Sequence, residues 1–166
     1  MTDFVKWFRY QLAASADGLE WAYAQIQAEY RAQIPPDPPY FGTWPPARHV
    51  WHVTEYERYL ALPSMYEWLD IQPPDDDWPD DDAAWAAAQS KGIDGLVAEF
   101  RRVRQQQIDL LDRLADLDWN EPRKTLWGSK PLSMVVTKTF QHTYEHGDTL
   151  LRMAIWWKEE PTSEQP

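Results

Sequence analysis

Histidines are the residues of this chain whose number and spacing point most directly to chemistry. The 166 residues include only four, and they fall in two pairs, His49 with His52 and His142 with His146. On a helix, residues four positions apart share a face, so His142 and His146 can direct two imidazoles at one point. A third imidazole from another helix would complete a three-histidine metal site with one position open to water or substrate.

A histidine on an apolar helix face is more often a core or cap residue that satisfies its own hydrogen bonds, and this alternative applies to His49 or His52 taken singly. It is less favourable for His142 and His146 together, because burying two unpartnered imidazoles has a desolvation cost that a metal ion removes. We therefore predict a metal site made of His52, His142 and His146, with His49 as a pocket residue. Three imidazoles suit Zn²⁺, Ni²⁺ or Fe²⁺, and the sequence does not choose among these ions.

Acidic and aromatic residues supply further candidates for the site. Glu55 and Glu145 lie close to the predicted ligands along the chain. Either carboxylate could orient an imidazole or act as a catalytic base, as could Asp148, although such charges on a helical bundle more often form a solvated face. Trp127 lies in a segment expected to be a loop, where there is less core to fill, and it is predicted to line the pocket with His49.

The string from His142 to His146 also fits the His-x-x-Glu-His pattern of the inverted zincin peptidases, with Glu145 as the acid. In those enzymes a third ligand, a glutamate, comes from a helix well downstream. Only twenty residues follow His146 here. The peptidase is therefore the less favoured interpretation.

The elements that must position these residues are predicted to be four long helices. Apolar residues recur every three or four positions over residues 2–33, 45–69, 83–117 and 131–157. A proline-rich run at 35–39 ends the first helix, and Pro63 is expected to kink or interrupt the second. Gly92 and Gly95 indicate a break in the third. Residues 118–130 are expected to include a short extended piece.

Four amphipathic helices predict an all-α protein, a four-helix bundle whose core is a suitable place for a metal site. The acidic, proline-bearing run at 73–82 is predicted to be a crossover loop between the second and third helices. We expect one domain over residues 1–158 and a flexible polar tail over 159–166.

The composition excludes several classes of function. Acidic residues outnumber Lys and Arg by 27 to 16, which argues against nucleic-acid binding. The local cluster of Arg101, Arg102 and Arg104 is predicted to be a solvated helix face. With no cysteine, the chain has no disulfide, thiolate nucleophile or thiolate metal site. No apolar run resembles a signal peptide or a membrane span, so we predict a cytoplasmic protein with no membrane partner.

Two stretches, residues 44–57 and 140–148, carry a resemblance to the DinB-like (damage-inducible, YfiT-like) superfamily of metalloenzymes. That family has a histidine followed by a glutamate on the second helix, which His52 and Glu57 match. It has a His-x-x-x-His on the last long helix, which His142 and His146 match.

The resemblance implies an up-down-down-up bundle, a three-histidine site that often holds nickel or zinc, and a homodimer. Related proteins include S-transferases that use the low-molecular-weight thiols bacillithiol or mycothiol, and a mycothiol-dependent maleylpyruvate isomerase. The favoured hypothesis is therefore a metal-dependent enzyme, a thiol-dependent S-transferase or a hydrolase, acting on a small-molecule substrate. The alternative is a non-catalytic bundle that binds a small ligand or a protein partner.

Overall fold

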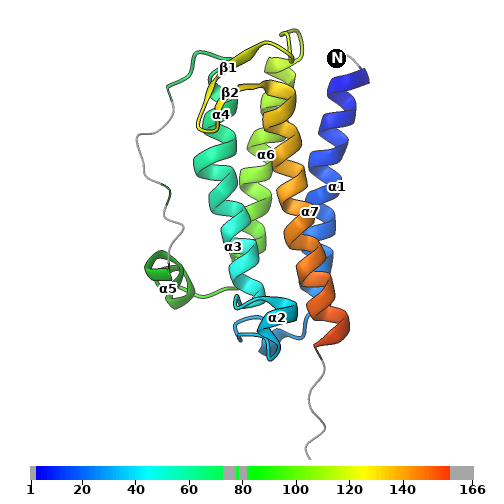
Figure 1. Cartoon of the computed structure of the whole chain (residues 1–166), viewed down its shortest axis with the longest axis vertical. Coiled ribbons are helices and arrows are strands. Elements are labelled where there is room, and N and C mark those ends of the chain that lie inside the picture. Colours follow the sequence, from blue (N-terminus) through cyan, green and yellow to red (C-terminus); the bar gives the residue numbers. More distant parts are fainter. Residues whose placement is uncertain (1–2, 73–77, 79–81, 158–166) are drawn as a thin grey trace, which may run out of the picture.

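Long helices dominate the computed structural model, which describes residues 3–72, 78 and 82–157 (Figure 1). Figure 1 shows α1 and α7 running in one direction and α3 and α6 in the other. The all-α prediction is confirmed. The predicted tail at 159–166 and most of the acidic run at 73–82 lie outside the described residues. The elements are α1 (Asp3–Gln25), η1 (Ala28–Tyr30), α2 (Pro38–Phe41), α3 (Pro46–Tyr56), η2 (Glu57–Ala61), α4 (Leu62–Tyr66), α5 (Asp82–Ser90), α6 (Leu96–Leu114), β1 (Pro122–Thr125), β2 (Gly128–Pro131) and α7 (Leu132–Trp156).

The first helix is shorter than the pattern predicted, because it ends at Gln25 and a single 3-10 turn follows. The side chain of Arg31 folds back over this end. Its Nε donates to the carbonyl oxygen of Ile26 (3.0 Å), and a terminal nitrogen donates to that of Ala24 (3.2 Å). Carbonyls at a helix end have no partner within the helix, so these bonds stabilise the early stop.

The apolar stripes of the long helices meet in the core as predicted. One buried cluster includes Phe8, Leu111 and Val136, and a second includes Leu19 and Phe100. Phe4 follows the apolar spacing of α1, but it is 46% exposed. It lies in the first turn of α1, where it packs edge-on against Phe8 and Trp119.

Pro63 does not interrupt the second helix. The chain passes from α3 through the π-helical turn η2 into α4, and Pro63 lies in the first turn of α4. Proline has no backbone N–H, and in an α-helix its ring would clash with the carbonyl four residues earlier, which belongs to Tyr59. Tyr59 lies within η2, so the wider turn falls where the proline would otherwise clash. Turns of this kind are frequent at functional sites.

The third predicted helix is divided, as its glycines indicated. The helix α5 ends at Ser90, and Gly92 adopts a positive φ of 99° before α6 begins at Leu96. The expected extended piece is the antiparallel hairpin of β1 and β2, in which Thr125 pairs with Gly128. Of the described helices, none combines the length and the apolar character that crossing a membrane requires.

Candidate metal centre

Three imidazoles meet between α3 and α7. The Nε2 atom of His142 lies 3.2 Å from the Nε2 atom of His52 and 3.2 Å from that of His146. One ring nitrogen from each of the three lies within 4.8 Å of the others. The helical spacing on α7 provides two of these side chains and α3 provides the third, so the structure brings together the three residues that the sequence selected as ligands.

The separation of these nitrogens fits coordination to one ion. With Zn–N bonds of about 2.0–2.1 Å, two nitrogens on a tetrahedral zinc are roughly 3.3 Å apart. In addition, Nδ1 of His142 is buried and has no hydrogen-bond partner among the described residues. A ring whose Nε2 binds a metal carries its proton on Nδ1, on the side away from the ion. The donor set therefore fits a divalent metal that accepts imidazole ligands.

His49 contacts one of the three predicted ligands, His146, through a ring nitrogen that the other two ligands do not contact. Its Nδ1 lies 2.8 Å from Nδ1 of His146, the nitrogen of that ring that does not face the other two ligands. The side chain of His49 is buried, and its Nε2 has no hydrogen-bond partner in the described part of the chain. The sequence predicted His49 in a pocket but not this contact with a ligand.

Aromatic rings surround the imidazoles. The Trp44 ring centroid lies 5.0 Å from that of His52, and Trp78 lies 5.8 Å from the same ring. Tyr56 packs against His142 at 4.0 Å, and Trp127 stacks on Tyr56 at 5.9 Å. Trp127 therefore reaches the site through Tyr56.

Tyr56 is a site residue that was not among the candidates predicted from the sequence. Its position four residues after His52 was the available signal, because that spacing places both on one face of α3. Its hydroxyl is buried and has no partner among the described residues. Burial raises the pKa of this hydroxyl well above its ordinary value, so it remains a protonated donor.

The three candidate carboxylates are already engaged by cations, and Asp148, 68% exposed, pairs with Arg152 at 3.1 Å. Glu55 is buried and accepts a hydrogen bond from Arg58 (2.6 Å), which also pairs with Glu99. Glu145 is 54% exposed, and it accepts a hydrogen bond from Gln141 (2.9 Å) and lies 3.7 Å from the Lys138 ammonium nitrogen. These contacts place Glu145 on a solvated face of α7.

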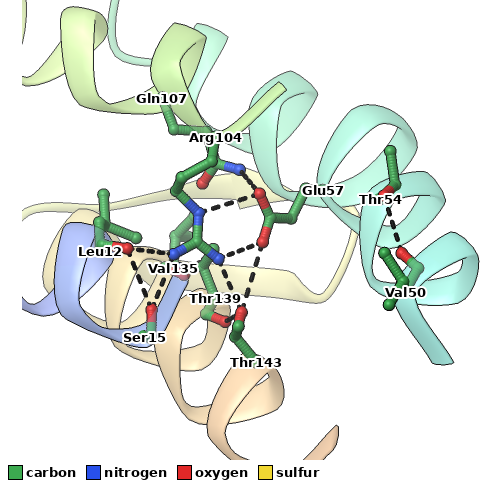
Figure 2. Close-up of polar contacts among 10 residues, drawn as sticks. All are labelled: Leu12, Ser15, Val50, Thr54, Glu57, Arg104, Gln107, Val135, Thr139 and Thr143. Atoms are coloured by element: carbon green, nitrogen blue, oxygen red, sulfur yellow. Dashed lines mark hydrogen bonds and ion pairs between the residues drawn. The ribbon is translucent and has the colours of Figure 1, made fainter. Parts of the chain in front are cut away.

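A buried ion pair fixes the helices around the imidazoles (Figure 2). The Nε atom of Arg104 on α6 donates to the Glu57 carboxylate in η2 (3.0 Å), and Gln107 donates to the same oxygen (2.7 Å). Terminal nitrogens of Arg104 donate to Ser15 on α1 and Thr143 on α7, each at 2.7 Å. Because Thr143 follows His142, this network joins the ligand-bearing helix α7 to the other three long helical segments.

Arg104 corrects the prediction of a solvated arginine face, since it is only 1% exposed. Arg101 and Arg102 do lie near the surface, with side chains 38% and 55% exposed. Arg104 instead falls on the inner stripe of α6 between Phe100 and Leu111, and that spacing was the signal for its burial.

Burial also keeps the imidazoles of His49, His142 and His146 neutral. Desolvation, with a smaller contribution from the neighbouring His52, lowers the pKa of His49 and of His142 from 6.5 to about 3. Desolvation, followed by the charges of the neighbouring histidines, lowers the pKa of His146 to about 2. A neutral imidazole has the free lone pair that metal binding requires.

These pKa values predict that metal-free protein loses stability as the pH falls below about 6.5. The histidines of the unfolded chain then bind protons, whereas His49, His142 and His146 of the native protein stay unprotonated until the pH approaches 2 to 3. Each histidine lowers the free energy of unfolding by up to about 1.4 kcal/mol per pH unit in this window. Urea unfolding of chelator-treated protein at several pH values between 7.5 and 5.5 measures the slope.

The matched control is His142→Phe, which removes one of the three neutral imidazoles and should give a shallower slope than the wild type. A stability of the wild type that is constant between pH 7.5 and 5.5 would contradict the native pKa values given above.

Comparison with known proteins identifies the family of this chain. The family model of the DinB superfamily matches residues 11–150, and the chain belongs to that superfamily. It is also 29% identical over 68 residues to the F-box protein At1g49990 of Arabidopsis thaliana, a match that covers 37% of this chain and only 16% of that protein. No solved structure matches the chain.

Proposed function

We propose that this protein is a metal-dependent enzyme in which His52, His142 and His146 hold a divalent ion, either Zn²⁺, Ni²⁺ or Fe²⁺. The observation that carries the proposal is the meeting of three Nε2 atoms from two helices, with neighbouring nitrogens 3.2 Å apart. Membership of the DinB superfamily supports it independently.

When bound in such a site, the ion supplies Lewis-acid chemistry, because it lowers the pKa of a water or thiol in its remaining coordination position. The residues of the chain then have separate tasks. The rings of Trp44 and Trp78 limit the access of water to the imidazoles. The Tyr56 hydroxyl is available to donate a hydrogen bond to a substrate atom. Glu55, which pairs with Arg58, is the more buried of the two proposed acid–base groups, Glu55 and Glu145.

The reaction we favour is the transfer of a low-molecular-weight thiol to a small electrophile, with hydrolysis as the alternative. The preference for thiol transfer rests on the activities of the family that the chain resembles. The predicted homodimer is part of the same proposal. Two exposed aromatic side chains support it, Trp7 of α1 and Tyr144 of α7, which both contact the partly buried Phe140 between them.

The test is a comparison of turnover with and without metal. Protein loaded separately with Zn²⁺, Ni²⁺ or Fe²⁺ is mixed with bacillithiol or mycothiol and monochlorobimane, whose chloride the thiol sulfur displaces, and in parallel with a panel of activated esters. We expect turnover with at least one ion, and a fall to the uncatalysed rate after chelation and in His142→Ala.

The control is Gln141→Ala, which alters the exposed neighbour of His142 and should keep the rate of the wild type. Turnover that persists in both chelated protein and His142→Ala would contradict a metal-dependent reaction. If no ion gave turnover with either substrate class, the non-catalytic ligand-binding bundle would be the better account.

A further inference from the structure

His49 is the one histidine that the proposed ligand set does not use. It lies on α3, one turn before His52, and its Nδ1 is 2.8 Å from Nδ1 of His146 on α7. The two ring centroids are 5.1 Å apart, with the planes inclined at 56°. His49 is 7% exposed, so this contact is made inside the protein, away from bulk water.

The chemistry of imidazole determines the direction of that hydrogen bond once a metal is bound. A neutral imidazole carries one N–H and one lone pair. If the Nε2 lone pair of His146 faces the ion, the proton of His146 is on Nδ1. That proton then lies between the two Nδ1 atoms, so His49 must accept it through its own Nδ1 lone pair and keep its proton on Nε2.

Neighbouring side chains hold His49 in this position. Trp44 packs against His49 at 5.5 Å and stacks on His146 at 6.3 Å, so one indole covers both rings. The Arg48 guanidinium lies 4.5 Å from the Trp44 ring and forms an ion pair with Asp82 at 2.7 Å. The indole is therefore packed between the histidines and a side chain that is itself held in place.

The same distances argue against His49 as a fourth ligand. The ligand nitrogens that meet are the Nε2 atoms of His52, His142 and His146. His49 instead contacts the opposite edge of the His146 ring. To reach the ion it would have to break the 2.8 Å contact and pass around that ring.

We propose that His49 is a positioning residue that holds His146 in the tautomer whose Nε2 binds the metal. This inference rests on the proposed function, because it takes the three imidazoles as ligands. Hydrogen-bond partners of this type fix the orientation of ligand imidazoles in metal proteins. Since His49 is neutral, it adds no negative charge to the ligand set, unlike the carboxylate that often has this role.

Two substitutions separate the hydrogen bond from the shape of the side chain. In His49→Asn the amide oxygen is attached to Cγ, as Nδ1 is in histidine, so an acceptor remains at that place. In His49→Leu the volume is similar but the acceptor is lost. We expect His49→Leu to bind Zn²⁺ about 10- to 100-fold more weakly than the wild type in competition with a chromophoric chelator. We expect His49→Asn to keep most of the affinity.

Nitrogen-15 NMR of the zinc-loaded wild type gives a second readout that does not depend on a variant folding. The expected spectrum has the His49 proton on Nε2, the His146 proton on Nδ1, and zinc on Nε2 of His146. Equal zinc affinity in His49→Leu and the wild type would overturn the inference, as would an equal loss in both variants or a zinc-bound His49. If the wild type bound none of Zn²⁺, Ni²⁺ and Fe²⁺, the proposed function itself would fail together with the inference.

Discussion

Replacing Arg104 with methionine is expected to lower the free energy of unfolding by about 3–5 kcal/mol. Methionine keeps the apolar part of the side chain but leaves the carboxylate of Glu57, which is completely buried, without its cation. It also removes the hydrogen bonds that Ser15 and Thr143 accept from Arg104. Unfolding in urea, followed by circular dichroism on metal-free protein, measures the loss.

Arg102→Met is the matched control, because Arg102 lies on the same helix and pairs with Glu99 at the surface. We expect this variant to lose less than about 1 kcal/mol. The double variant Glu57→Leu with Arg104→Met should lose less than the sum of the two single changes, since no charge is left unpaired. If Arg104→Met were no more destabilising than Arg102→Met, the buried ion pair would not contribute as described.

Zinc is expected to stabilise the wild type and to leave His142→Ala almost unchanged. A ligand present at a hundred times its dissociation constant adds about 2.7 kcal/mol to the free energy of unfolding. For a chain of this length, that shift raises the melting temperature by about 5–10 °C. His142 is the ligand whose Nε2 contacts both of the others, so its removal leaves two imidazoles without their central neighbour. Thermal unfolding with and without Zn²⁺ measures the difference.

Gln141→Ala controls for a general effect of changing α7, and it should keep the full zinc shift. Mg²⁺ prefers oxygen ligands and should give no shift in any variant. A zinc shift of equal size in His142→Ala and the wild type would mean that the ion binds elsewhere on this acidic protein.

The candidate site could be predicted from local spacing, because its ligands depend on helix geometry. The i,i+4 relation of His142 and His146 places both on one face of α7 whatever the rest of the fold does. His49 and His52 are three residues apart, a spacing that also lets both side chains lie on one face of α3. Gly92 and Gly95 also predicted where the third helix is divided, whereas Pro63 did not interrupt the second helix and the first helix ended before the proline-rich run at 35–39.

Contacts between distant segments could not be predicted in this way. The contact between His49 and His146 depends on how α3 and α7 are aligned, and no local pattern specifies that alignment. The burial of Arg104 depends on a partner 47 positions away, Glu57, so a cluster of arginines was interpreted as a surface. The early end of α1 depends on a side chain that folds back from beyond the helix.

The most direct test of the account is metal analysis by mass spectrometry on protein purified without an affinity tag or chelator, beside His142→Ala prepared in the same way. The account predicts about one equivalent of Zn, Ni or Fe per wild-type chain and a near-complete loss in the variant. Equal metal content in the two samples, or none in the wild type even after incubation with Zn²⁺, Ni²⁺ and Fe²⁺, would contradict the assignment of His52, His142 and His146 as ligands.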